Sequence, residues 1–284
     1  MSTPETRRRI PRDRDDDYAE AAAAERRAFV EAETGTVLRH MAHHSQPPDQ
    51  LPGNIEHFTG VAQVPVGLAG PLRMVGEHAQ GDFYVPMATT EGTLVASYNR
   101  GMRLLAECGG VRATVVDEAM QRSPVFQFDH ALAARQFGEW VVDHMDGIRA
   151  AAEATTRSGK LREIMQFAIG PLRYLRFNFT TGDAAGQNMV SKATLAACEW
   201  IRAEHPDHPD FVLSGNIDTD KKHSQINTLL TRGKRVVAEC TLTDEAVRRI
   251  MGTSTEALFR MRQVSQAGAF MAGSANNGAH AANG

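Results

Sequence analysis

The chain has 284 residues, of which 42% are hydrophobic and 23% charged, and its formal net charge is -3. This composition is typical of a globular protein of one or two domains, and the small net charge gives no general reason to expect nucleic acid or an anionic membrane as a partner. Three cysteines, Cys108, Cys198 and Cys240, lack the spacing of a disulfide framework or a zinc site, so we expect no metal and a reducing cytoplasm. No apolar run approaches the ~20 residues of a membrane-spanning helix, and we expect neither such a helix nor a signal peptide.

The first 52 residues are expected to form an N-terminal helical segment. Residues 15–34 are rich in helix formers, begin with acids that suit a helix N-terminus, and stop at Gly35, a good C-terminal cap. A polar, proline-rich break at 43–54 follows. Residues 61–72 then mix β-formers with glycine and proline, as short strands and tight turns do, so a new unit is expected to begin near residue 53.

The middle of the chain alternates helix and strand signals. Residues 92–110 predict a helix that opens just after Glu91, which places this acid in a turn at or near a helix N-terminus. A strand is predicted from residue 111, and residues 130–165 are predicted to be helical, with a break near 157–159. In 172–180, "LRYLRFNFT", apolar and polar residues alternate with the period of a half-buried strand.

The later segments continue the mixed α+β pattern. A small-residue loop after residue 180 leads into a predicted helix at 189–204. Residues 211–216 and 234–242 are strand-like, and Thr253 with Glu256 has the spacing of a helix capping box.

Two segments and one arginine could carry chemistry. The loop "TTGDAAGQNM" opens a helix, where free N–H groups and the helix dipole could receive phosphate while Asp183 contacts a ribose; a simple helix-capping loop is an equal alternative. In "SGNIDTDKKHSQIN", Lys221 follows Asp220 and could stabilise an oxyanion, or the segment could be a solvated turn. Arg122 could bind a carboxylate in a bidentate manner, although a lone arginine is more often solvated.

Five sequence blocks, taken in order, resemble 3-hydroxy-3-methylglutaryl-CoA (HMG-CoA) reductase. They are "VPVGLAGPL", "VPMATTEGTLVASYNRG", "GDAAGQNMVSK", the segment from "SGN" through "TDKK" to "RGK", and "AGS" followed by "GAHAAN". The sequence around Glu91 is similar to the class I, NADPH-preferring branch of the family. The resemblance implies reduction of HMG-CoA to mevalonate and free CoA in two hydride steps, with NADPH as the cofactor; the residues themselves leave NADH open.

The resemblance also implies roles for individual residues. Glu91 would be the catalytic acid, and Lys221 would be the cation that stabilises the developing oxyanion. The residues implied in substrate binding are Arg122, Ser214, Asp220, Lys222, Asn99, Arg100, His280 and Asn283. The residues implied in cofactor binding are Arg157, Asp183, Ala184, Gly186, Gln187 and Asn188. For His280, which lies between alanines, a structural position in a core is the alternative.

The implied fold is α+β. A large CoA-ester-binding domain, in two pieces at 53–122 and 214–284, would be interrupted at 123–213 by a small ferredoxin-like nicotinamide-binding domain. A homodimer or higher oligomer, with the active site where subunits meet, is also implied.

The resemblance leads us to expect a chain that is incomplete at its C-terminus. The family's third catalytic acid, and the histidine that protonates the CoA thiolate, would both lie after Gly284, so the chain alone is expected to be inactive or impaired. The alternative function is a non-catalytic module or pseudoenzyme that binds a CoA ester or a nicotinamide.

Overall fold

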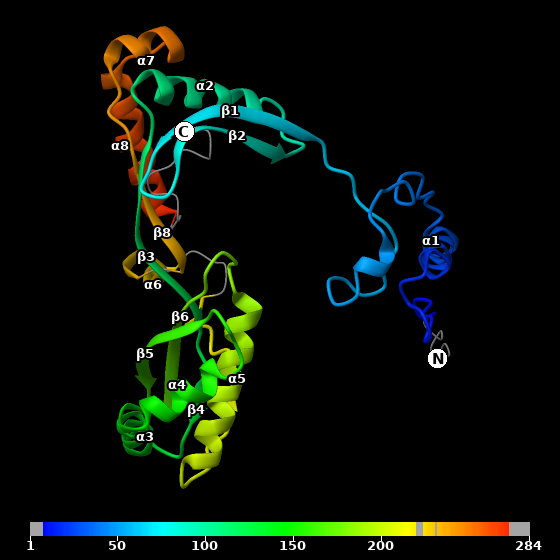
Figure 1. Ribbon diagram of the computed structural model, residues 1–284, viewed down its shortest axis with the longest axis vertical. Coiled ribbons are helices and arrows are strands. Elements are labelled where there is room, and N and C mark those ends of the chain that lie inside the picture. Colours follow the sequence, from blue (N-terminus) through cyan, green and yellow to red (C-terminus); the bar gives the residue numbers. More distant parts are fainter. Residues whose placement is uncertain (1–7, 220–223, 231, 273–284) are drawn as a thin grey trace. The chain divides into compact units, whose positions relative to one another are not determined.

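The computed structural model describes residues 8–219, 224–230 and 232–272, which divide into two compact units. The described part of the first unit contains residues 8–68 and 86–92, and that of the second contains 69–85 and the described residues from 93 onwards (Figure 1). Helices and strands alternate along the chain, so the predicted mixed α+β class is confirmed. The domain boundaries at 52, 122 and 213 remain predictions.

The first unit is organised around helix α1, Glu20–Thr34, and contains a short 3-10 helix, η1, Pro48–Gln50. Helix α1 ends at Gly35, which has φ 68°, as predicted. It begins five residues later than predicted because the aspartates before it bind the backbone instead: the Asp13 side chain accepts from the N–H groups of Asp15 and Asp16. The buried Arg26 on this helix donates to the carbonyl of Phe58, which joins the helix to the segment after η1.

The hairpin of β1, Val66–Val75, and β2, Gln80–Ala88, forms a two-stranded sheet and is followed by helix α2, Leu94–Glu107. One ten-residue strand thus replaces the predicted short strands and turns, and it contains a cis peptide at Gly70–Pro71. Leu104 of α2 is buried against Val247 of α7, Asp244–Met251, which precedes α8, Thr255–Met271.

The prediction of a capping box at Thr253 and Glu256 is wrong. Ser254, and not Thr253, is the N-cap, because its side chain accepts from the N–H of Ala257. The side chain of Asp244 fixes this junction by accepting from both the N–H and the hydroxyl of Thr255.

A six-stranded sheet dominates the second unit, and all of its pairings are antiparallel. Its strand order is β7-β4-β6-β3-β8, with β5 paired to the other edge of β6. The strands are β3, Arg112–Arg122; β4, Val125–Gln127; β5, Lys160–Ile169; β6, Leu172–Thr180; β7, Phe211–Val212; and β8, Gly233–Glu239. The first eight residues of β3 lie along β8, and its last three pair with β6, so one strand joins two parts of the sheet.

The helices α3, Ala131–Asp143, α4, Met145–Glu153, and α5, Gln187–Glu204, lie between strands of this sheet in the sequence. The order β4-α3-α4-β5-β6-α5-β7, together with the spatial order β7-β4-β6-β5, is that of a ferredoxin-like layer. This is the arrangement expected for residues 123–213. A short helix, α6, Gln225–Leu229, lies between β7 and β8.

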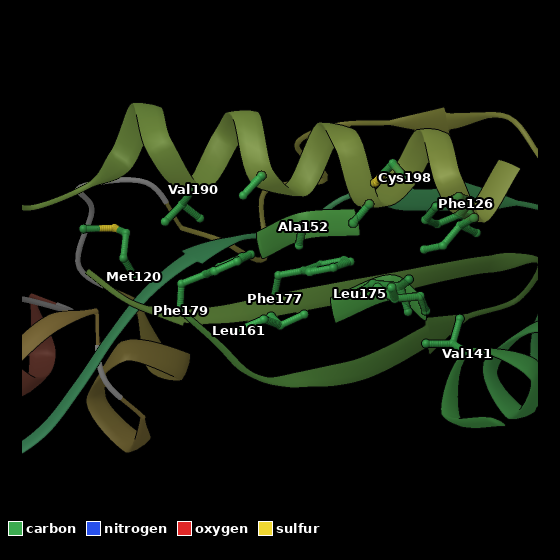
Figure 2. Close-up of a cluster of buried hydrophobic side chains, with 14 of the residues drawn as sticks. Met120, Phe126, Val141, Ala152, Leu161, Leu175, Phe177, Phe179, Val190 and Cys198 are labelled. Carbon is green, nitrogen blue, oxygen red and sulfur yellow. The ribbon is translucent and has the colours of Figure 1, made fainter. Parts of the chain in front are cut away.

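The main hydrophobic core lies between these three helices and one face of the sheet. Figure 2 shows Leu175, Phe177 and Phe179 of β6 beneath α5, which contributes Val190 and Cys198. The opposite face of β6 is also covered, since Arg176 and Asn178 are 1% and 2% exposed. The prediction of a half-buried strand is therefore wrong: the Arg176 guanidinium donates to Asn178 Oδ1 and to the carbonyl of Ile217, and a loop covers this side.

Two other sequence predictions are corrected by strand pairing. Residues 160–165 belong to β5 and not to a helix, because the strand pairs with β6 along its length, from Lys160 opposite Thr180 to Ile169 opposite Leu172. Their helix-favouring side chains are thus overridden by tertiary pairing. In the segment 211–216, only Phe211 and Val212 form a strand.

Candidate active site

Glu91 lies in an exposed turn directly before α2, as predicted. Its backbone N–H donates to Thr89 Oγ1 at 2.9 Å, and the Thr89 N–H donates to the carbonyl of Pro65 at 3.1 Å. The following N-cap residue, Thr93, has φ 65°, a left-handed conformation that is costly for a β-branched residue. The turn is thus held by defined contacts and by a strained backbone, while the carboxylate that it carries stays exposed.

One face of α2 borders a cavity of about 600 Å³. Asn99 Oδ1 accepts from the N–H of Gly70 at 2.7 Å, which ties the helix to β1. The cavity is lined by Gly70, Pro71, Arg73, Asn99, Arg103, Ala106 and Glu107. Arg100, which was predicted to lie near the CoA, is exposed and is not one of these lining residues, whereas Arg103, four residues after Asn99 on the same helix, is one of them.

Arg122 is the last residue of β3, and its side chain is bonded on two sides. Nη1 donates to Asp218 Oδ2 at 2.9 Å, while Nε and Nη2 donate to Ser191 Oγ at 3.0 and 2.6 Å. Ser191 lies on α5, and Asp218 lies in the loop after β7. Arg122 is therefore the residue at which three separate segments of the second unit meet.

The loop at 214–219 leads directly to the predicted catalytic lysine segment. Ser214 is exposed, and its hydroxyl donates to Asp218 Oδ2 at 2.9 Å, so the predicted pocket residues Arg122 and Ser214 are brought together by one carboxylate. The loop is strained, with φ 67° at Asn216 and φ 60° at Thr219. The Thr219 hydroxyl donates to the carbonyl of Asp218 and accepts from Asn227 Nδ2, both at 2.7 Å, which holds this conformation.

The predicted cofactor loop forms a tight turn at the start of α5. Thr181 Oγ1 donates to the carbonyl of Ala184 at 2.8 Å, and Gly186 has φ 77°. A Cβ on Gly186 would lie 2.5 Å from Thr181 Cγ2, so only glycine fits. Helix α5 then begins at Gln187, and its N-cap residue, Gly186, provides no side-chain cap. Asp183, Ala184 and Asn188 are exposed around this junction.

The turn that carries Arg157 lies beside this junction. Met189 of α5 provides the contact: the Thr156 hydroxyl donates to its sulfur at 3.0 Å, and a Cβ on Gly159 would lie 2.7 Å from its Cε. Arg157 is exposed in the same turn. The structure therefore brings together two segments that were both predicted to bind the cofactor and that lie about 30 residues apart in the sequence.

Lys234 of β8 makes a contact with the predicted cofactor loop that the sequence did not suggest. Its ammonium group donates to the carbonyl of Gly182 at 3.1 Å, inside the predicted cofactor loop, and to Glu118 Oε1 at 2.8 Å. The hydrogen bond from Lys234 lowers the pKa of Glu118. The Thr181 hydroxyl is 3.4 Å from the same carboxylate. One end of the loop is thus anchored to β3 and β8.

Five predicted site residues lie outside the described residues: Asp220, Lys221, Lys222, His280 and Asn283. Among the described residues, no three histidine, cysteine or acidic side chains cluster as a metal site would require. The helices within that part of the chain include none that is both long enough and apolar enough to cross a membrane.

The second unit therefore combines two features: a loop-to-helix junction suited to the phosphates of a nucleotide, and a nearby arginine suited to a carboxylate. The sequence profile of hydroxymethylglutaryl-coenzyme A reductase matches residues 22–284, and the chain belongs to this family.

Relatives named 3-hydroxy-3-methylglutaryl-coenzyme A reductase are similar over most of the chain. The protein of Pyrococcus abyssi is 43% identical over 91% of this chain and 64% of its own length. That of Methanothermobacter thermautotrophicus is 42% identical over 91% of this chain and 66% of its own length. The chain thus spans slightly less than two thirds of these relatives.

Solved structures support the fold. The 3-hydroxy-3-methylglutaryl-coenzyme A reductase of Streptococcus pneumoniae superimposes with a TM-score of 0.59 at 17% identity, covering 77% of this chain and 55% of that one. A class II reductase from the same organism, bound to NADPH in open conformations, gives 0.59 at 18% identity, over 77% of this chain and 56% of that one.

Proposed function

We propose that this chain acts in the NADPH-dependent reduction of HMG-CoA to mevalonate and CoA. The observation that carries the proposal is the position of Arg122, a carboxylate-binding side chain held between the 214–219 loop and the first turns of α5. Membership of the reductase family supports the same reaction and does not favour a module that only binds.

The substrate has a carboxylate at one end and a long CoA group at the other. Of the five N–H donors of a guanidinium, Arg122 uses three within the described residues, which leaves two for a ligand carboxylate. The hydroxyl of Ser214 donates to the same Asp218 carboxylate. The cavity beside Asn99 and Arg103 is the region that we assign to part of CoA. Asp220, Lys222, His280 and Asn283 stay in the proposed substrate set through the family resemblance alone.

The residues around α5 fit a nicotinamide dinucleotide. The N-cap residue of α5 is Gly186, which provides no side-chain cap, and the N-terminus of this helix offers a favourable dipole to a phosphate. The exposed Arg157 in the adjacent turn suits the extra phosphate of NADPH over NADH. When bound, NADPH supplies the two hydrides that convert a thioester into an alcohol.

Two side chains are assigned to charge and proton handling. Glu91 would donate a proton to the carbonyl oxygen as it is reduced, since its carboxyl group is exposed on a turn of fixed backbone. Lys221 would stabilise the negative charge that develops on that oxygen. The requirement for protons follows from the chemistry, because each hydride added to a carbonyl leaves an oxygen that must be protonated.

A homodimer or higher oligomer in the cytoplasm belongs to the same proposal. Helix α8 supports assembly, because none of its described residues is buried and it exposes Phe259, Met261, Val264, Phe270 and Met271. We assign a second copy of the chain as the group that covers this helix. Light scattering after gel filtration would give the mass that tests this part of the proposal.

The test is an assay of the intact gene product with HMG-CoA and NADPH. Loss of NADPH absorbance, together with mevalonate detected by mass spectrometry, is expected for the wild-type protein. Glu91→Gln and Lys221→Ala should each reduce kcat by a large factor, and each should still bind both ligands.

Two outcomes would contradict these assignments. Undiminished turnover in either variant would remove that residue from the reaction. Binding of HMG-CoA and NADPH by the wild-type protein without any mevalonate would replace the reductase proposal with the non-catalytic binding module.

A further inference from the structure

The orientation of the Arg122 guanidinium is set by two side chains that have no assigned role. Ser191 Oγ accepts from Nε and Nη2, while Asp218 Oδ2 accepts from Nη1, so the two edges of the planar group are bonded to different segments. Because a guanidinium is rigid and planar, contacts on two edges fix the direction of its remaining N–H groups.

Asp218 is suited to positioning and not to ligand binding. It is 1% exposed, and its side chain is occupied by Arg122 and by the hydroxyl of Ser214. A buried carboxylate is costly unless it is paired and hydrogen-bonded, so Asp218 keeps Arg122 and Ser214 in place. The guanidinium of Arg232 donates to the Asp218 carbonyl at 3.0 Å, which fixes the backbone of the same residue.

Ser191 connects this arrangement to the helix of the cofactor junction. Its hydroxyl donates to the carbonyl of Gln187 at 2.9 Å, so its lone pairs are left for Arg122. Gln187 is the first residue of α5 and belongs to the predicted cofactor loop. Ser191 thus links the orientation of Arg122 to the helix turn that would hold the cofactor.

We propose that Asp218 and Ser191 are positioning residues that orient Arg122 towards the substrate carboxylate and hold it in register with the first turns of α5. This inference rests on the proposed function. An interaction with a carboxylate distant from the reacting thioester is made equally in the bound substrate and in the transition state. Its loss therefore raises KM and leaves kcat unchanged.

The kinetic test uses Ser191→Ala and Asp218→Asn in the intact protein. Each should raise the KM for HMG-CoA about tenfold, with kcat and the Kd for NADPH unchanged. Ser191→Thr, which keeps the hydroxyl, should restore the wild-type KM. The matched control is Thr194→Val on the same helix. Thr194 is fully buried, and its hydroxyl has no hydrogen-bond partner among the described residues. This variant should therefore keep the wild-type KM for HMG-CoA.

A second measurement reports on Arg122 without turnover. Phenylglyoxal modifies accessible guanidinium groups, and mass spectrometry gives the rate at each arginine. In the wild-type protein, Arg122 should react slowly, and Ser191→Ala or Asp218→Asn should increase its rate about tenfold, as expected when a hydrogen bond to a charged group is lost. The exposed Arg100 should react at one rate in all of these proteins and serves as the internal reference.

The two measurements separate the possible failures. If Arg122 reacts at the same rate in the wild-type protein and in both variants, the positioning proposal is overturned, whatever the activity. If the rates change as expected in a protein that neither reduces nor binds HMG-CoA, the positioning stands and the proposed substrate is wrong. A fall in kcat, or loss of rescue by Ser191→Thr, would identify a general structural defect and overturn the proposal.

Discussion

Helix α4 lies so close to α5 that replacing Gly147 by alanine should destabilise the ferredoxin-like layer. A Cβ on Gly147 would overlap with the indole ring of Trp200, so one of the two groups would have to move. Movement of that ring is restricted by its neighbour Trp140, whose centroid is 6.1 Å from that of Trp200. Overpacking of this kind costs about 1–3 kcal/mol, whereas alanine is favoured over glycine inside a helix by about 1 kcal/mol. The net expectation is a loss of about 1 kcal/mol.

Tryptophan fluorescence during urea unfolding measures this layer alone, since the chain has two tryptophans, Trp140 and Trp200, and both lie in it. Ala150→Gly provides the matched control. Ala150 is exposed on the same helix, so this change measures helix propensity without overpacking and should cost about 1 kcal/mol.

The packing argument predicts that the sign of the Gly147→Ala effect depends on Trp200. In a Trp200→Leu background, where Trp140 still reports unfolding, Gly147→Ala should become stabilising by about 1 kcal/mol. The reasoning would be refuted if Gly147→Ala raised the free energy of unfolding in the wild-type background by as much as Ala150→Gly lowers it.

Four further predictions follow from other contacts. Lys234→Met should weaken NADPH binding about fivefold in a fluorescence titration, because the proposed cofactor loop loses its anchor at Gly182. The effect is modest because the half-exposed ion pair of Lys234 with Glu118 stabilises this arrangement by at most about 1 kcal/mol. Lys234 lowers the pKa of Glu118, so the stability from this pair is present above the usual glutamate pKa and is lost as the pH falls through the lowered value; Glu118→Gln should remove that acid dependence of the unfolding midpoint. Phe177→Ala should cost about 3–5 kcal/mol by urea unfolding, because the ring is fully buried. Burial raises the pKa of Cys198, so iodoacetamide should label it only in urea; labelling under native conditions would contradict the packing of α5.

The sequence predicted the local segments of the site well. The position of Glu91 just before α2 follows from the local helix pattern, and the loop that opens α5 is set by nearby glycines and small side chains. Gly186 illustrates this, since its positive φ and its contact with Thr181 both arise within six residues.

The partners of those segments could not be predicted in the same way. Arg122 is 96 residues from Asp218 and 69 from Ser191, so its environment depends on strand order and not on any local pattern. From the sequence alone, a solvated side chain was therefore the commoner interpretation of Arg122. The same limit explains β5, whose residues favour a helix locally but pair with β6 once the sheet forms.

The anchor of the proposed cofactor loop depends on one irregularity in the sheet. Strands β3 and β8 pair Val115 with Val236, and a bulge before Asp117 then shifts the ladder so that Glu118 lies opposite Lys234. An uninterrupted antiparallel ladder would instead place Glu118 opposite Gly233, which has no side chain to reach the loop. The extra residue thus aligns β8 with the cofactor loop, while the end of the same β3 strand, paired with β6, carries Arg122 to Ser191. One strand therefore fixes both the anchor of the proposed cofactor loop and the proposed carboxylate-binding arginine.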